Sequence, residues 1–190
     1  MIDEQKTDDD DKPERYEEVE EKLNTRKPSK LKLIIFIFSL LVIMSLVVLA
    51  SRSANPNNKP LYNVKRLYEK TQLSLKSTPV ARLNYLYSLL DKRLAELNFI
   101  VENGESLYVL PTASRYSTTA GQIAELIVQN NLRDESRKAI EKLEQHLAIV
   151  ESLPQKYQKN DEEIKYIIDD ANYLKIYITQ LSSFQDGDLK

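Results

Sequence analysis

The chain has no cysteine and no tryptophan, and only one histidine and three glycines among its 190 residues. The absence of cysteine excludes disulfides, thiolate metal sites and cysteine nucleophiles. A β-sandwich or β-barrel needs many turns with positive φ, which glycine adopts most readily. The scarcity of glycine therefore favours a protein built from helices.

One long apolar run, Leu33–Ala50, contains no charge, glycine or proline. A helix rises about 1.5 Å per residue, so this run is just long enough to cross the hydrocarbon core of a bilayer. It predicts a chain of four parts: a disordered cytoplasmic tail (1–32), a transmembrane helix (33–50), a spacer (51–60) and an extracytoplasmic helical domain (61–185).

Basic residues are more frequent before the apolar run, where Arg26, Lys27, Lys30 and Lys32 lie, than after it, where Arg52 and Lys59 lie. The positive-inside rule then predicts a single-pass protein of the cell membrane, with its N-terminus in the cytoplasm. A cleaved signal peptide is the alternative, since small residues precede Ser51. The run is longer than the roughly 7–15 apolar residues of a signal peptide, which favours an uncleaved anchor.

The tail, residues 1–32, carries 11 acidic and 8 basic side chains, with an acidic block at Asp8–Asp11. Such a segment buries little apolar area and is expected to be disordered. A docking peptide for a cytoplasmic partner and a solvated tail are both compatible with this pattern, and the solvated tail is favoured. The rest of the chain has 19 basic and 18 acidic residues, a balance that predicts no nucleic-acid partner.

Apolar residues recur every three or four positions through the domain, which predicts an all-α fold with an antiparallel bundle of four to five helices. The strongest stripe contains Leu83, Leu86, Leu90, Leu94, Leu97 and Val101. In the first helix the stripe is Leu61, Val64, Leu67, Tyr68 and Leu75, and Lys65, Arg66, Glu69 and Lys70 are expected to face water. The expected helices span about 61–76, 79–102, 112–130, 133–153 and 160–183, and segment 105–111 is either a loop or a first turn.

The segment Pro60-Leu61-Tyr62-Asn63-Val64-Lys65-Arg66 resembles the opening of an uncharacterised bacterial domain family, whose members place Pro-Leu-Tyr-x-x-Lys-Arg-x-x-Glu just after a membrane span. Arg82 and Arg93-Leu94-Ala95-Glu96 match the family's second helix, and the resemblance extends to about Leu132. Some members resemble anti-sigma factors with a cytoplasmic zinc-binding domain. The tail of this chain has no cysteine or histidine, so the resemblance implies a membrane-anchored sensory or interaction module and no sigma-binding role.

Isolated polar residues give weak signals for chemistry. His146 has no carboxylate three or four residues away on its own helix, which favours a surface or boundary position over a metal or catalytic site. Asp161, Glu162 and Glu163 favour the start of a helix over a cation site. The adjacent Asp169 and Asp170 are expected on a solvated face. Accordingly, no catalytic residue, metal or cofactor is predicted.

Tyrosine supplies the best candidate binding residues, because it is enriched at interfaces. The candidates are Tyr85, Tyr87, Tyr166, Tyr173 and Tyr177, although rings half-buried at the edge of the bundle would give the same pattern. The sequence therefore predicts a non-enzymatic interaction or sensory module that binds the lipid bilayer and either a protein partner or another copy of itself. The alternative is a self-associating scaffold or stalk at the cell envelope.

Overall fold

Six helices make up most of residues 30–52, 54–159 and 162–187, which this computed structural model describes. They are α2 (Lys30–Ser51), α3 (Lys59–Ser74), α4 (Pro79–Glu102), α5 (Ser106–Gln129), α6 (Arg133–Lys156) and α7 (Ile164–Asp186). These residues contain no strand, so the predicted all-α class is confirmed. The chain divides into two units, residues 1–46 and residues 47–190, which are described separately.

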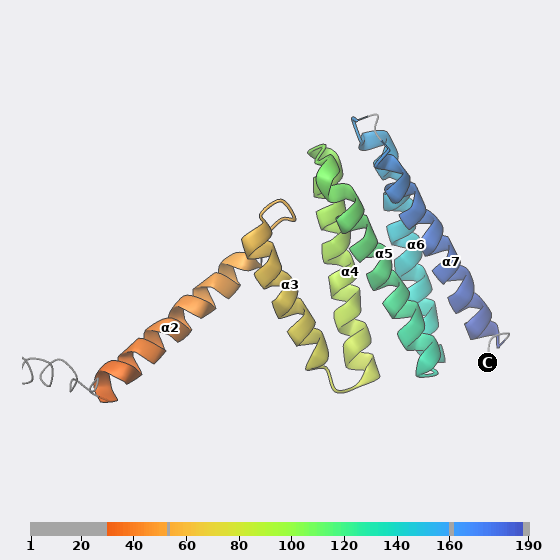
Figure 1. The fold of residues 1–190 in the computed structure, drawn as a ribbon. Helices are drawn as coiled ribbons and strands as arrows, with labels where there is room; N and C mark the ends of the chain where they lie inside the picture. Colours follow the sequence, from red (N-terminus) through yellow and green to blue (C-terminus); the bar gives the residue numbers. More distant parts are fainter. Residues whose placement is uncertain (1–29, 53, 160–161, 188–190) are drawn as a thin grey trace, which may run out of the picture. The chain divides into compact units, whose positions relative to one another are not determined.

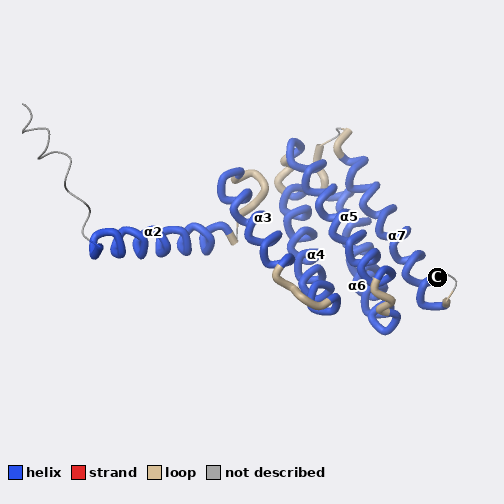
Figure 2. Tube along the Cα trace, turned by 60° about the horizontal axis from the view of Figure 1, so that its bottom comes forward, coloured by secondary structure: helices blue, strands red, loops and turns tan. Residues whose placement is uncertain are grey.

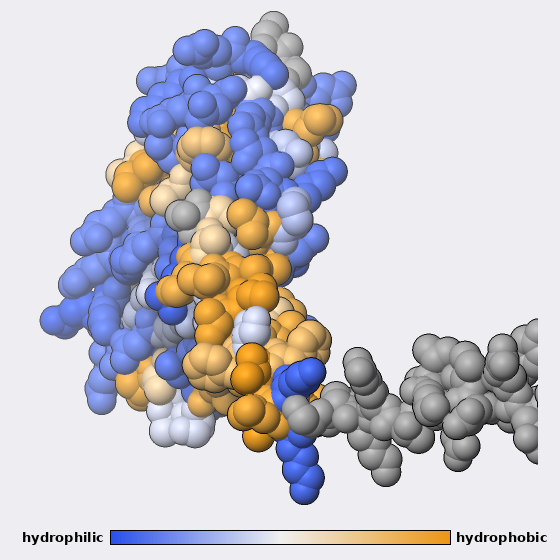
Figure 3. All heavy atoms as spheres, turned by 90° about the vertical axis from the view of Figure 1, so that its left-hand side faces the viewer, coloured by the Kyte–Doolittle hydropathy of each residue, from blue (hydrophilic) through white to orange (hydrophobic). Residues whose placement is uncertain are grey.

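The first unit contains most of α2. All its side chains from Lys30 to Leu46 are exposed, and most are large and apolar. Figure 3 shows them as the large orange area beside the long grey stretch, whereas most of the other visible surface is hydrophilic. Helix α2 is long enough and apolar enough to cross a membrane, and the described residues contain one such helix.

The second unit is a helical bundle in which α3 to α7 alternate in direction along the chain (Figure 1). Helix α5 is central, since it packs against α4, α6 and α7. Helices α6 and α7 form the other extensive pair, and Figure 2 shows the same side-by-side arrangement from a second direction. By contrast, α3 packs only against α4, and sparsely.

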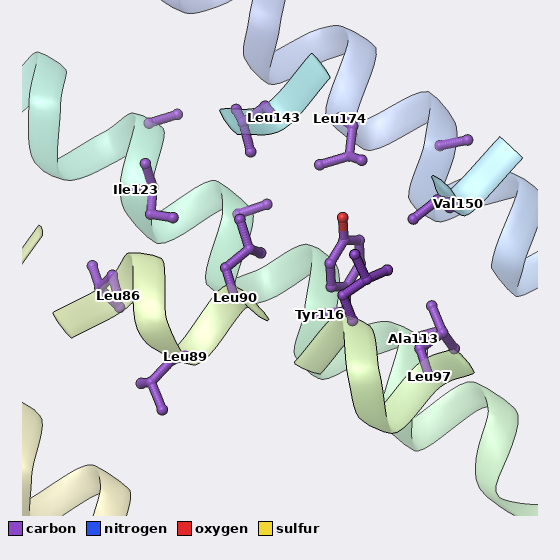
Figure 4. Packing of buried hydrophobic residues seen from close by; sticks show 14 of the residues in the cluster. Leu86, Leu89, Leu90, Leu97, Ala113, Tyr116, Ile123, Leu143, Val150 and Leu174 are labelled. Atoms are coloured by element: carbon purple, nitrogen blue, oxygen red, sulfur yellow. The ribbon is translucent and has the colours of Figure 1, made fainter. Parts of the chain in front are cut away.

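The bundle core is made by the apolar stripes that the sequence predicts. All six residues of the α4 stripe are buried, as are Tyr116, Ala120, Ile123, Ala124 and Ile127 of α5. Figure 4 shows Leu90 and Leu97 of α4 packed with Tyr116 of α5, whose hydroxyl is directed toward the side where α6 and α7 lie. Each fully buried leucine or isoleucine contributes roughly 1.5–3 kcal/mol to folding, so this core accounts for the bundle's stability.

Helix α5 begins at Ser106, earlier than the predicted Thr112, and it contains Pro111. Proline lacks the N–H that would donate to the carbonyl four residues earlier, which belongs to Leu107. Both residues are exposed, Leu107 to 87%. Because water reaches this turn, the lost hydrogen bond is replaced by hydration and the helix continues through the proline.

Residues 54–58 form turns that contact the domain. Ala54 and Pro56 are buried, and the Asn58 N–H donates to the carbonyl of Asn55 at 3.0 Å. The Asn57 side-chain amide donates to Glu105 at 2.8 Å. The expected spacer is therefore tied to the bundle over these residues, because local polar groups find partners there. Helix α7 begins at Ile164, and residues 160 and 161, where the last helix was expected to begin, lie outside the described residues.

Replacing Thr78 with alanine is expected to lower the free energy of unfolding by about 1 kcal/mol, because its hydroxyl accepts from the Ala81 N–H at 3.2 Å and caps α4. Urea unfolding of the full chain in detergent micelles, followed by circular dichroism, measures this change. Thr71→Ala is the matched control. The Thr71 hydroxyl lies within α3 and bonds back to Leu67, so alanine there is expected to be neutral or slightly stabilising.

Candidate functional site

The five candidate tyrosines occupy different environments. Tyr87 is 7% exposed and belongs to the core, and Tyr85 is half-buried with its hydroxyl 3.4 Å from the carbonyl oxygen of Glu69. Tyr166, Tyr173 and Tyr177 lie together on α7 and line one hollow. The structure therefore groups the three tyrosines of α7 and separates them from the two on α4.

The tyrosine groove is a hollow of about 480 Å³ between α5 and α7. Its lining consists of Leu110, Ser114, Ser117, Thr118, Tyr166, Asp169, Asp170, Tyr173 and Tyr177. The rings of Tyr173 and Tyr177 stack with centroids 6.4 Å apart and planes 17° apart. A Cβ atom on Gly121 would lie 2.9 Å from the Tyr177 hydroxyl, so glycine is what allows this ring to lie against α5.

Asp170 lies on the buried side of α7, and the expectation of a solvated face is wrong for this residue. It is 2% exposed, and its Oδ2 has no hydrogen-bond partner among the described residues. Burial raises the pKa of Asp170 to about 8, although the nearby Ser117 hydroxyl opposes this shift. Asp169 is exposed as expected. The two neighbours differ because adjacent helical residues point about 100° apart.

His146 is also buried, at 4% exposure, so the expected surface or boundary position is wrong. Its Nε2 lies 3.0 Å from Asp91 Oδ1, and its Nδ1 lies 3.2 Å from the Tyr116 hydroxyl. A carboxylate only accepts, so Nε2 carries the proton and Nδ1 accepts from Tyr116. Burial lowers the pKa of His146, and the Asp91 hydrogen bond opposes this effect. Its carboxylate partner comes from α4 and not from its own helix, which is why sequence spacing missed it.

Hydrogen bonds join Asp91 of α4, His146 of α6 and Tyr116 of α5 into a polar chain through the bundle. Asp91 is half-exposed and also pairs with Lys142, whose Nζ lies 2.6 Å away. Burial raises the pKa of Tyr116, and the nearby Asp170 and Asp91 carboxylates raise it further. The polar chain thus runs inward from the surface at Asp91 to Tyr116, and the charge of Asp170 of α7 is close enough to act on Tyr116.

A second polar group, the charge cluster, joins α3 to α4. Its members are Tyr62, Lys65 and Glu69 of α3 and Arg93 and Glu96 of α4, each less than a tenth exposed. Lys65 Nζ lies 2.7 Å from Glu96, and the Tyr62 hydroxyl donates to Glu96 at 2.8 Å. Arg93 pairs with Glu69 and, at 2.9 Å, with Glu96. Two cations and two carboxylates therefore neutralise one another in the interior.

The electrostatics of the charge cluster follow from this pairing. Burial alone would raise the pKa of Glu96, but Arg93 and Lys65 hold it below its ordinary value. Lys65 also donates to the Ala54 carbonyl at 3.1 Å, which fixes the turn before α3. One atom stays unpaired, since Oε1 of Glu69 is buried without a partner among the described residues.

The charge cluster reverses the predicted orientation of α3. Lys65 and Glu69 were expected to face water but are buried, whereas Leu67 and Leu75 of the apolar stripe are 67% and 69% exposed. Arg93 supplies one reason, because it offers α3 a buried charge partner that apolar spacing cannot reveal. The predicted orientation is therefore wrong for these four residues, whereas Arg66 and Lys70 are exposed as expected.

A groove runs between α3 and α5 (the α3–α5 groove). Three adjoining hollows of about 480, 710 and 450 Å³ form it, and they share residues: the first two both contain Asn63, Arg66 and Arg115, and the last two both contain Leu73 and Gln122. On the side formed by α5, its lining residues extend from Leu107 to Asn130, which is about the length of that helix. Outside the charge cluster, its charged residues are five cations and one acid, namely Lys59, Arg66, Lys70, Arg82, Arg115 and Glu125.

Arg115 stands at the centre of this groove. Its guanidinium lies 4.9 Å from the ring centroid of Tyr62 and donates to the Thr112 hydroxyl at 3.0 Å. Its Nε is buried and has no partner among the described residues. Burial lowers the pKa of Arg115; Tyr62 and Glu96 oppose this shift, and the neighbouring charges of Arg93 and Arg66 add to it. The Glu96 carboxylate therefore does not fully compensate for the burial of Arg115 and for its cationic neighbours.

Comparison with known proteins was made on the whole chain. No curated protein and no solved structure matches it. Residues 55–173 match the family described as "Domain of unknown function (DUF5667)". This match includes the charge cluster, all but one of the tyrosine groove's lining residues, and most of the bundle. Since it covers more than half of the sequence, the chain belongs to the DUF5667 family.

Proposed function

We propose that the protein is a single-pass membrane protein whose extracytoplasmic bundle is a non-enzymatic interaction module, and that the α3–α5 groove binds an acidic segment of a protein partner in the cell envelope. Helix α2 supplies the anchor. The excess of Lys and Arg before this helix supports a cytoplasmic N-terminus and an extracytoplasmic bundle.

The unneutralised positive charge of the α3–α5 groove carries the proposal. Within the described part of the chain, Arg66, Lys70 and Arg82 form no ion pair. Arg66 and Lys70 line the same hollow as Arg115. The charge of Arg66 repels that of Arg115, whose Nε is buried without a partner among the described residues. A carboxylate-bearing segment would relieve this repulsion, and charge complementarity of this kind also speeds association.

The size and chemistry of the groove favour binding over catalysis. A groove as long as α5 measures about 36 Å, which suits an extended segment of about ten residues or several helical turns. Among its described lining residues there is no histidine or aspartate. The side-chain amides of Gln122 and Asn63 can donate hydrogen bonds to a bound backbone or carboxylate.

A self-associating scaffold is the second candidate function. The observation that favours it is the outward position of Leu67 on α3 and of Leu75 just after it, which leaves two large apolar side chains exposed beside a helix that packs sparsely on α4. A second copy of the chain would bury them. This function predicts a dimer or larger oligomer of the full chain, which light scattering in detergent detects.

Binding of a labelled polyglutamate peptide to the full chain in lipid nanodiscs tests the groove. The double variant Arg66→Glu/Lys70→Glu is expected to bind at least tenfold more weakly, since about 1.4 kcal/mol corresponds to a factor of ten. The affinity of the unmodified chain should also fall as salt is added, because exposed charges are screened. Fluorescence anisotropy gives both values.

Arg137→Glu/Lys138→Glu is the matched control, because it makes the same charge change on exposed positions of α6 that lie outside the groove. Equal loss of affinity in both double variants would mean that only net charge matters and would refute a specific groove. If only Arg66→Glu/Lys70→Glu loses affinity, a partner captured from native membranes should also bind this double variant more weakly than the unmodified chain.

A further inference from the structure

The tyrosine groove combines aromatic rings with a buried carboxylate, one oxygen of which lacks a partner among the described residues. We propose that this groove binds an organic ammonium ion, with Asp170 accepting its N–H groups and Tyr173 and Tyr177 contacting its charge and hydrocarbon through their rings. The inference concerns α5 and α7 and is independent of the function proposed for the α3–α5 groove.

Asp170 gives the first argument. It lines the groove, only 2% of its surface is exposed, and its Oδ2 has no partner among the described residues. A buried acceptor without a donor is costly, and such atoms are rare in folded proteins. An ammonium group supplies both the missing donor and the opposite charge.

The aromatic rings give the second argument. Cations bind over the faces of tyrosine rings within about 6 Å of the centroid. The α7 helix already has one such contact, since Lys165 Nζ lies 5.1 Å from the centroid of Tyr166. Tyr173 and Tyr177 form a stacked pair beside Asp170, and Tyr173 is 47% exposed, so its ring can turn without opening the core.

The charges around Asp170 select the sign of the ligand. The groove is lined by two carboxylates and by no lysine or arginine within the described structure, which disfavours an anion. The titratable groups around Asp170 are Asp169 and Tyr177 on α7 and Tyr116 on α5, with His146 of α6 behind Tyr116. None of them is a permanent cation, so the neutral Ser117 hydroxyl is the internal group that stabilises the ionised carboxylate.

The size and ligand set of the groove distinguish an organic cation from a metal ion. Among the described residues there is no group of three histidine, cysteine, aspartate or glutamate side chains that could hold a metal. A hollow of about 480 Å³ also exceeds what a bare ion needs. One buried carboxylate and two ring faces match an alkylammonium group, which needs few directed ligands.

Calorimetric titration of the full chain in lipid nanodiscs with butylammonium chloride tests the site at neutral pH. Asp170→Asn is expected to weaken binding at least tenfold, and Tyr173→Leu about threefold. Because the pKa of Asp170 is raised to about 8, binding to the unmodified chain should release protons, which buffers of different ionisation enthalpy reveal. Asp170→Asn should abolish that release.

Asp186→Asn is the matched control, since it removes an exposed carboxylate of α7 that lies outside the groove and should change the affinity less than twofold. Equal affinity of the unmodified chain and Asp170→Asn would refute the site. The ammonium can belong to a free polyamine or to a lysine side chain. Tighter binding of spermidine would assign the first source, and tighter binding of a short lysine-containing peptide would assign the second.

Discussion

Replacing Arg93 with methionine is expected to lower the free energy of unfolding by about 3–5 kcal/mol. Arg93 neutralises Glu69 and Glu96, and all three side chains are buried. Its removal leaves two carboxylates in the interior with only Lys65 to balance them, and a broken buried pair has a cost of this size. Urea unfolding of the full chain in detergent micelles measures the loss.

The effect should be concentrated in α3, since this helix packs only against α4 and contributes mainly Tyr62, Lys65 and Glu69 to the interior. Hydrogen exchange should therefore become faster in the amides of α3 before those of α5 change. A second variant separates lost charge from lost packing. Arg93→Met/Glu69→Gln should recover part of the stability, because it removes one of the two uncompensated carboxylates.

Lys175→Met is the control for this prediction. Lys175 forms an ion pair with Glu151 at 2.8 Å, but both side chains are about half exposed. Exposed pairs contribute at most about 1 kcal/mol, so this variant should remain close to the unmodified chain. If Arg93→Met lost no more stability than Lys175→Met, the charge cluster would not be what holds α3 on α4.

The sequence predicts the bundle core well because burial there follows apolar spacing. In α4 the residues from Leu83 to Val101 form one stripe, and every member of that stripe is buried. In α3 the same reasoning fails, since Lys65 and Glu69 are buried at the expense of Leu67. Periodicity measures how apolar a face is, whereas burial of a charge depends on a partner 24 or more residues away, as with Glu69 and Arg93.

The candidate site shows the same division between local and long-range information. The spacing of Tyr166, Tyr173 and Tyr177 places three rings on one stripe of α7, and the structure brings them to one groove. Spacing along α7 does not reveal that α5 forms the other side of this groove. It also does not reveal that Asp170 is buried beside these rings, because both features arise from the packing of α5 against α7. His146 gave no signal for a related reason, because its hydrogen-bond partners lie on two other helices.

Asp170→Asn is expected to stabilise the protein at neutral pH and above, on the order of 5 kcal/mol at pH 8. The pKa of Asp170 is raised from 3.8 to about 8 in the folded chain, whereas the unfolded chain keeps the ordinary value. Between these values the unfolded state releases a proton that the folded state retains. Stability therefore falls as pH rises, by roughly 1.4 kcal/mol for each pH unit. Asparagine has nearly the same shape and does not titrate, so this dependence should disappear.

Guanidinium unfolding of the full chain and of Asp170→Asn, between about pH 5 and about pH 8, tests this expectation. His146 acts in the opposite direction, since its lowered pKa reduces stability as pH falls. His146 is present in both proteins, so the difference between the two curves isolates Asp170. Asp169→Asn should leave the slope unchanged, because that carboxylate is exposed. Parallel curves for the unmodified chain and Asp170→Asn would show that Asp170 is already ionised at neutral pH, and an ammonium ligand would then bind without releasing a proton.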